Sequence, residues 1–426
     1  MTQTPTSSIK IGCIADDFTG ATDLANNLVR AGMRVVQTIG VPQSPLDAAA
    51  DAVVVALKSR TVVADDAVAQ SLAALHWLQQ QGAQQIYFKY CSTFDSTAQG
   101  SIGPVTDALM DALGCDFTIA TPAFPDNKRT VFKGYLFAGD VLLNESGMQN
   151  HPLTPMTDPN LVRVLQPQTR RKVGLIDHTV VAQGEAAIRA RIDALKAQGV
   201  GIAIVDAVSN ADLLRMGPAF KDLPLLTAGS GVAIALPANF GLAPSSQAAA
   251  LPPATGRQAI VSGSCSVATN QQVLHFIQSG RPAMVIDPLR IAAGVVRAEA
   301  LAWAQDKLAS GPVLFYSTAD TTAVKAVQGQ LGVEEAGALV ERTIASIARG
   351  LVELGVQQLV VAGGETSGAC VQALEIGQML IGPQIDPGVP WCHAATPAAN
   401  GGLHITLKSG NFGTPDFFTK AFFALA

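Results

Sequence analysis

The sequence predicts an α/β protein with two domains, each a mostly parallel sheet flanked by helices, and an active site in the cleft between the domains. Two features predict this class. Short runs rich in valine and isoleucine alternate with longer Ala/Leu-rich stretches of helical period, and the short runs are apolar at most of their positions. Strands of this kind are typical of sheets that helices cover on both faces.

The N-terminal part of the chain contains most of the predicted elements. Its apolar runs predict strands at Ile9–Ala15, Ala52–Leu57, Gln85–Lys89, Phe117–Thr121, Lys172–Ile176, Gly201–Val205 and Leu223–Thr227. The stretches of helical period between them predict helices at Ala21–Ala31, Ala67–Gln81, Ile102–Leu113 and Glu185–Gln198. A repeated strand–helix order of this kind favours a parallel sheet.

A stretch with almost no hydrophobic periodicity, residues 241–257, is predicted to link two domains, residues 1–240 and 258–426. A second irregular region, residues 122–167, is predicted to be a functional loop or a small subdomain. The C-terminal domain continues the alternation, with strands at Gln258–Ser262, Ala283–Ile286, Pro312–Ser317 and Gln358–Ala362 and helices at Thr269–Ser279 and Ala336–Leu354.

The composition excludes several classes of protein. Charged residues are only 14% of the chain, against about 25% in an average soluble protein, and the formal net charge of −5 argues against a nucleic-acid partner. Hydrophobic residues are 48% of the chain, which argues against disorder, yet no apolar run approaches the roughly 20 residues of a membrane span. The N-terminus lacks a signal-peptide pattern, and the six cysteines form no CxxC pair. We therefore expect a cytoplasmic enzyme without membrane or nucleic-acid partners.

Polar residues gather directly after the predicted strands, where open parallel sheets bind their ligands. After the first strand come Asp16 and Asp17, followed by Thr19. Asp17 or Thr19 is a good candidate to cap the next helix. Two adjacent carboxylates are more than a cap requires, and they suit Mg²⁺ binding or general-base chemistry.

The next two strands add cations and hydroxyl groups. Lys58 and Arg60, which flank Ser59, are predicted to lie on one face of an extended segment, where they could bind a carboxylate, although a solvated loop would look the same. The third strand ends at Lys89 and leads into Ser92, Thr93 and Asp95, which suit a polyhydroxylated ligand or an ordinary turn. Charged and hydroxyl residues that follow successive strands at one edge of the sheet indicate a binding site.

Glycine-rich turns follow strands of the C-terminal domain. They are predicted to bind phosphate, because glycine lets a backbone approach closely and helix N-termini supply N–H groups. The candidate residues are Ser262, Ser264, Gly363, Gly364, Glu365, Thr366, Ser409, Gly410 and Asn411, with a helix expected to begin near Ser367. No P-loop, GxGxxG, HExxH or GxSxG pattern occurs, which leaves Asp, Lys, Arg, hydroxyl and backbone groups, the tools of phosphoryl transfer.

Residues 14–23 resemble the N-terminal signature of the four-carbon acid sugar kinases, and residues 261–266, 362–368 and 408–413 look like the nucleotide-domain motifs of that family. The resemblance covers essentially the whole chain. The form of residues 408–413 and the loop 90–97 are most similar to the branch that acts on 3-oxo-tetronate. The resemblance implies an N-terminal acid-sugar domain, a C-terminal ATP domain, and transfer of the γ-phosphate to the terminal hydroxyl, with Mg²⁺ beside the ATP.

The resemblance places the ATP contacts on the glycine-rich turns but does not say which aspartate is the base. We predict Asp17 as general base, with Asp16 orienting the substrate or the water on the metal. Lys58, Arg60 and Lys89 are predicted to bind the substrate carboxylate, and Ser92, Thr93 and Asp95 its hydroxyls. Thr19 and Ser59 are predicted to contact the substrate as well.

Three alternatives stay open: a threonate or erythronate kinase of the same family, a non-catalytic sensor of nucleotide and sugar acid, and an NAD-linked dehydrogenase. The metal ligands and a homo-oligomeric state are left open as well.

Overall fold

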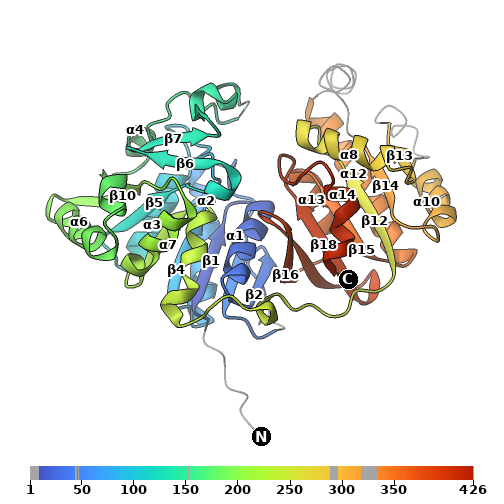
Figure 1. Ribbon diagram of the computed structural model, residues 1–426, viewed down its shortest axis with the longest axis horizontal. Coiled ribbons are helices and arrows are strands. Elements are labelled where there is room, and N and C mark those ends of the chain that lie inside the picture. Colours follow the sequence, from blue (N-terminus) through green and yellow to red (C-terminus); the bar gives the residue numbers. More distant parts are fainter. Residues whose placement is uncertain are drawn as a thin grey trace, which may run out of the picture. The chain divides into compact units, whose positions relative to one another are not determined.

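The computed structural model describes residues 9–43, 46, 48–151, 153–287, 296–317 and 333–425 (Figure 1). The chain forms two compact units, residues 1–249 and 250–426, and the division falls inside the stretch without hydrophobic periodicity. Both units combine a sheet with flanking helices, which confirms the predicted α/β class.

The N-terminal unit has a parallel sheet in the order β2-β3-β1-β4-β11-β5-β10-β9. Every residue of β1, β3 and β4 is buried, so both faces of the sheet are covered. The strands are β1 (Ile11–Ala15), β2 (Val35–Ile39), β3 (Ala52–Ala56), β4 (Gln85–Lys89), β5 (Thr118–Thr121), β9 (Lys172–Ile176), β10 (Val200–Val205) and β11 (Leu225–Ala228). The helices are α1 (Phe18–Arg30), α2 (Ala64–Gln80), α3 (Ile102–Leu113), α4 (Leu161–Leu165), α5 (His178–Val181), α6 (Glu185–Ala197) and α7 (Asn210–Met216).

The irregular region 122–167 contains a small antiparallel sheet of β6 (Arg129–Phe132), β7 (Tyr135–Ala138) and β8 (Val141–Leu142). Asp206, which follows β10, fixes the turn between β6 and β7. Its carboxylate accepts hydrogen bonds from the backbone N–H groups of Lys133 (2.6 Å) and Gly134 (2.8 Å). This part of the chain is thus a small subdomain bound to the carboxyl end of β10.

The C-terminal unit has a mixed sheet. Strands β13, β14, β12, β15 and β18 are parallel in that order, and β17 and β16 continue the sheet antiparallel beyond β18. The strands are β12 (Arg257–Ser262), β13 (Ala283–Val285), β14 (Val313–Tyr316), β15 (Val356–Ala362), β16 (Gln378–Asp386), β17 (Val389–Thr396) and β18 (Ala399–Lys408). The helices are α8 (Val267–Gln278), α10 (Val296–Lys307), α12 (Val333–Glu353), α13 (Gly364–Ala373) and α14 (Phe417–Lys420).

Several elements begin elsewhere than predicted, or were not predicted. Helix α1 begins at Phe18 rather than Ala21, and α13 begins at Gly364 rather than near Ser367. Strand β2 and the antiparallel strands β16–β18 were not predicted. Gly382 and Pro383 interrupt β16, and Gly401 and Gly402 interrupt β18, so neither forms a continuous apolar run.

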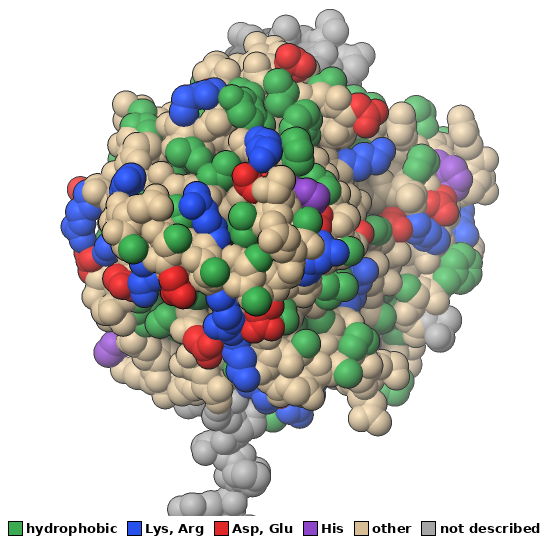
Figure 2. All heavy atoms as spheres, turned by 60° about the vertical axis from the view of Figure 1, so that its left-hand side comes forward, with side chains coloured by type: hydrophobic (Ala, Val, Ile, Leu, Met, Phe, Trp, Pro, Cys, Tyr) green, Lys and Arg blue, Asp and Glu red, His purple; other side chains and the backbone are tan. Residues whose placement is uncertain are grey.

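The surface carries no broad area of one charge on the face that Figure 2 shows, where acidic and basic side chains are interspersed. Within the described part of the chain, no helix is both long enough and apolar enough to cross a membrane.

Candidate active site

Strands β3, β1 and β4 end level with one another in the N-terminal unit. Ala15, the last residue of β1, lies opposite Ala56 of β3 and Lys89 of β4. Asp16 and Asp17, the segment Lys58–Arg60 and the loop after Lys89 therefore leave the sheet at one edge. This register places the acids of the first predicted cluster beside the cations of the second.

Asp17 caps helix α1. Its Oδ1 accepts a hydrogen bond from the Gly20 backbone N–H (3.0 Å), and its Oδ2 accepts one from the Thr19 hydroxyl (2.9 Å). Thr19, the other candidate cap, therefore supports the cap from inside the first turn. Asp17 keeps 27% of its side chain exposed, against 7% for Asp16, so Asp17 is the more accessible acid.

Asp16 is held by Arg60 and is not a free carboxylate. The Arg60 guanidinium donates from Nε to Oδ2 (2.9 Å) and from Nη2 to Oδ1 (2.8 Å) of Asp16, and Nη2 also donates to Asp17 Oδ1 (2.7 Å). Arg60 is thus already bound to both acids, whereas Lys58 is exposed and Ser59 is buried. The predicted pairing of Lys58 with Arg60 around a substrate carboxylate stays a prediction.

The charges around Asp17 keep it ionised. Burial alone would raise its pKa, but attraction to Arg60 and Lys89, with the hydrogen bonds from Thr19 and Gly20, holds the pKa below its ordinary value. The Arg60 pKa moves the other way: burial opposes the charge, and the two aspartates raise the pKa well above its ordinary range. An ionised, partly exposed carboxylate is in the right state to accept a proton.

Lys89 and Asp23 lie beneath this pair, and Asp23 was not among the predicted site residues. The Lys89 side chain is buried, and a Cβ at Gly20 would lie 2.2 Å from Asp17 Oδ1 and 2.7 Å from Lys89 Nζ, so a side chain there would displace both groups. Asp23 Oδ2 accepts a hydrogen bond from Ser230 (2.6 Å), while its buried Oδ1 has no partner. Burial raises the pKa of Asp23 to about 7, opposed by Lys89 and Ser230. Asp23 shares its helix face with Asn26, Asn27 and Arg30, so no pattern in the sequence set it apart from a solvated polar face.

The loop after β4 carries the predicted hydroxyl ligands. Ser92, Thr93 and Asp95 are all half-buried there. Phe94 has a positive φ of 53° and is fully buried. Its ring packs edge-on against the ring of Tyr90, with 5.2 Å between the two ring centroids. A non-glycine residue with this backbone conformation persists only where its surroundings enforce it. The packing of the buried Phe94 ring against Tyr90 therefore fixes the backbone conformation of this loop.

In the C-terminal unit, three predicted loops meet at the carboxyl ends of β12, β15 and β18. Ser262 lies opposite Ala362, which in turn lies opposite Lys408. A Cβ at Gly410 would lie 2.7 Å from Ser264 Oγ, so the loop after β18 touches the loop after β12. The Thr269 hydroxyl also donates to the Gly410 carbonyl (2.8 Å), which links the third loop to the first turns of α8.

Gly363 and Gly364 open helix α13 for different reasons. Gly363 has φ of +121°, and a Cβ there would lie 2.8 Å from Thr366 Oγ1, so a side chain would be strained and crowded. Gly364 and Glu365 are exposed, Thr366 is buried, and a Cβ at Gly364 would meet nothing within 4 Å. The helix N-terminus is thus open at Gly364, as a backbone phosphate site requires.

Lys408, outside the predicted set, holds the third loop together. The side chain is fully buried, and its Nζ donates to Thr269 Oγ1 (3.0 Å) and to the carbonyls of Ser409 (3.0 Å), Gly410 (3.1 Å) and Phe412 (3.2 Å). Burial lowers the pKa of Lys408 to about 7, while its four oxygen acceptors favour the ammonium. Ser409 and Asn411 lie beside it in the loop, and Asn411 is exposed.

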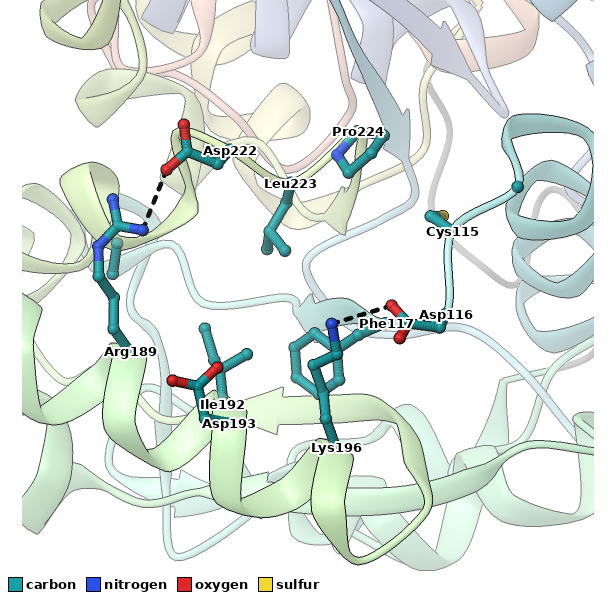
Figure 3. A pocket seen from close by; sticks show the side chains of 12 residues that line it. Cys115, Asp116, Phe117, Arg189, Ile192, Asp193, Lys196, Asp222, Leu223 and Pro224 are labelled. Atoms are coloured by element: carbon teal, nitrogen blue, oxygen red, sulfur yellow. Dashed lines mark hydrogen bonds and ion pairs between the residues drawn. The ribbon is translucent and has the colours of Figure 1, made fainter.

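A separate cavity of about 410 Å³ opens at the other edge of the N-terminal sheet (Figure 3). Its walls include residues 114–117 and 222–224, which precede β5 and β11, so it lies at the amino ends of these strands. Ion pairs cross it from Arg189 to Asp222 and from Lys196 to Asp116, both at 3.1 Å. This cavity contains none of the predicted site residues.

Comparison with known proteins matches both units to domain families. A family described as a sugar-binding N-terminal domain matches residues 11–236, and one described as a nucleotide-binding C-terminal domain matches residues 259–418. The 3-oxo-tetronate kinase of Pseudomonas fluorescens (strain Pf-5) is 59% identical over 423 residues, covering 98% of this chain and 97% of its own. The 3-oxo-tetronate kinase of Burkholderia multivorans is 60% identical over 420 residues, or 97% of each chain.

Solved structures agree with this assignment of the fold. A Salmonella typhimurium LT2 protein, provisionally described as a tRNA synthase, superposes with a TM-score of 0.88 at 45% identity, covering 97% of this chain and 98% of its own. A Haemophilus influenzae protein superposes with a TM-score of 0.81 at 44% identity, covering 97% of this chain and 100% of its own.

Proposed function

Because the chain belongs to the four-carbon acid sugar kinase family, we propose that it phosphorylates 3-oxo-tetronate at its terminal (C4) hydroxyl, with ATP as donor. One observation carries the choice of substrate. Curated kinases of that name are 57% to 60% identical to this chain over nearly its whole length. The enzyme is a sugar-acid kinase, and therefore a phosphotransferase with a nucleotide substrate.

The proposed chemistry uses groups of both units. The oxygen of the C4 hydroxyl attacks the γ-phosphorus, the bond from that phosphorus to the bridging oxygen of ADP breaks, and the hydroxyl proton passes to the Asp17 carboxylate. Arg60 holds Asp16 and Asp17 in place through its three hydrogen bonds. The exposed backbone at Gly364 and the loop 409–411 supply N–H groups for the phosphates. Transfer requires the two substrates to lie side by side. We still predict that they do so in the cleft between the domains.

Mg²⁺ is expected to enter with the phosphates of ATP and to neutralise charge on the transferred group. Among the described residues, no three His, Cys, Asp or Glu side chains gather into a metal site. Mg²⁺ usually keeps several waters and takes one or two carboxylates besides the phosphates, so such a cage is not required. Glu365, in the first turn of α13, is our candidate to meet this ion through water.

A coupled ADP-release assay tests the proposed function. The full-length protein is given MgATP with 3-oxo-tetronate, threonate or erythronate, and the highest kcat/KM is expected with the 3-oxo acid. A higher kcat/KM with threonate or erythronate would contradict the proposal that 3-oxo-tetronate is the substrate. Binding of the acids without sustained ADP release would indicate a sensor, and thermal stabilisation by NAD but not by MgATP would indicate a dehydrogenase.

Replacing Gly364 by alanine tests the nucleotide site. The added methyl group meets no protein atom within 4 Å, so stability should stay within about 1 kcal/mol or rise slightly. The same methyl would occupy the space through which a phosphate approaches the helix N-terminus, so the KM for ATP should rise by roughly tenfold, the loss of about one charge-assisted hydrogen bond.

Gly337→Ala in α12 is the matched control, because its Cβ position is also open and helical. Steady-state kinetics and thermal unfolding of both variants decide the matter. An unchanged KM for ATP in Gly364→Ala would remove the helix N-terminus from the proposed site.

A further inference from the structure

Arg129 is a half-buried cation in the N-terminal unit. It is the first residue of β6 and follows the carboxyl end of β5. Its Nη1 donates to the Asn127 carbonyl, but its buried Nε has no acceptor. Among the described residues, no carboxylate oxygen lies within 4.0 Å of the Arg129 guanidinium, so Arg129 forms no ion pair there. Burial lowers the pKa of Arg129, and a guanidinium nevertheless stays charged in proteins.

Asp95 lies in the loop after β4, which leaves the sheet at the same edge as the segment that carries Arg129. Ala228 of β11 lies opposite both Lys89, the last residue of β4, and Thr121, the last residue of β5. The charge of Asp95 also opposes the effect of burial on the pKa of Arg129, although the two side chains form no ion pair. The buried Oδ1 of Asp95 accepts no hydrogen bond, and the hydroxyl of the next residue, Ser96, is buried and unpaired as well. An unsatisfied donor and an unsatisfied acceptor are therefore carried by two segments at one edge of the sheet.

Cys91 connects this pair to the two aspartates of the candidate active site. Burial raises the pKa of its thiol to about 12, and the charges of Asp95, Arg60 and Asp16 all act on it. The backbone N–H of Asp95 also donates to Cys91 Sγ at 3.0 Å. Arg129 and Asp95 thus border the same site as Asp16 and Asp17, and they offer groups that those acids do not use.

We propose that Arg129, in place of the sequence-predicted Lys58, Arg60 and Lys89, binds the C1 carboxylate of the substrate and that Asp95 accepts a hydrogen bond from the adjacent C2 hydroxyl. The pair would recognise an α-hydroxy acid. The planar fork of arginine matches a carboxylate, and a ligand that satisfies both buried groups offsets the cost of leaving them unpaired. This assignment rests on the proposed function, since it names the subsite that orients C4 toward Asp17.

Binding measured without nucleotide tests the subsite. Threonate and erythronate are titrated calorimetrically into the wild-type protein and Arg129→Gln, with erythrulose as a neutral four-carbon comparison. Arg129→Gln should weaken binding of both acids by about 10- to 100-fold, the effect of losing a charge-assisted hydrogen-bonded contact, and leave erythrulose binding unchanged. Arg129→Lys should recover part of the loss, because it keeps the charge but not the fork. Asp95→Asn should abolish the preference for threonate over 3,4-dihydroxybutanoate, which lacks the C2 hydroxyl.

Arg163→Gln is the control, because this arginine is exposed and paired with Asp158. Equal loss of acid and neutral ligands in Arg129→Gln would show a merely structural role and overturn the proposal. Unchanged acid binding in that variant, or no binding of the acids by the wild type, would overturn it too. If the wild type binds the acids but releases no ADP, the proposed function fails, while the binding comparison still decides the role of Arg129.

Discussion

Replacing Asp17 by asparagine is expected to lower kcat by about 10²- to 10⁴-fold, the usual contribution of a positioned general base. The change should leave the fold intact, because asparagine caps helices as well as aspartate does. Its amide cannot accept the hydroxyl proton, however. Since the pKa of Asp17 lies below its ordinary value, protonation of this group should not reduce kcat anywhere above about pH 4. Steady-state kinetics with 3-oxo-tetronate and a thermal unfolding curve measure both effects.

Asp177→Asn is a closely matched control. Asp177 also caps a helix, pairs with a cation (Lys133, 3.0 Å) and keeps 28% of its side chain exposed. It follows β9 at the far edge of the sheet, away from β1. Its replacement should leave kcat unchanged. If Asp16→Asn abolishes turnover and Asp17→Asn does not, the roles of the two acids are reversed.

Replacing Lys408 by methionine is expected to disrupt the nucleotide loop. The variant keeps the apolar stem but leaves three carbonyls and the Thr269 hydroxyl without their shared donor. Leaving a buried acceptor without its donor typically costs about 1–3 kcal/mol. We expect a lower unfolding temperature and loss of measurable ATP affinity, with faster hydrogen exchange at residues 409–413.

Lys420→Met controls for the loss of a lysine in the same unit. Lys420 pairs with Asp386 at 2.6 Å and is 30% exposed, while Asp386 is only 7% exposed, so the loss of Lys420 should lower the unfolding temperature but leave ATP affinity unchanged. Calorimetric titration with MgATP and hydrogen exchange of both variants make the comparison. An unfolding temperature and ATP affinity for Lys408→Met equal to those of Lys420→Met would show that the ammonium does not organise the loop.

Much of the fold could be predicted because its parallel strands are short, mostly apolar runs between stretches of helical period. Strand β4, which is buried throughout, and strand β9, which is only partly buried, both have the predicted ends. Strands β16–β18 leave no such pattern, because glycine, proline and polar residues interrupt them and their pairing depends on partners distant in the sequence. The alternation of strand and helix was therefore informative only for the parallel part of each sheet.

The candidate site could be predicted in outline but not in its pairings. The edge that gathers Asp16, Asp17 and Lys89 follows from strand order alone. That Arg60 binds the two acids depends on the path of the loop after β3, which the sequence does not reveal. Asp23 was missed for a related reason, because its partner Ser230 lies 207 residues away in the chain.

The position of β18 also sets the order in which the enzyme can be completed during synthesis. This strand lies between β15 and β17 and carries the third nucleotide loop at its end. The two earlier loops, at residues 262–266 and 363–366, emerge from the ribosome first but cannot contact Gly410 until β18 has been made and inserted. A nascent chain that stops before residue 399 therefore has all the residues of the proposed sugar site but lacks part of the proposed nucleotide site.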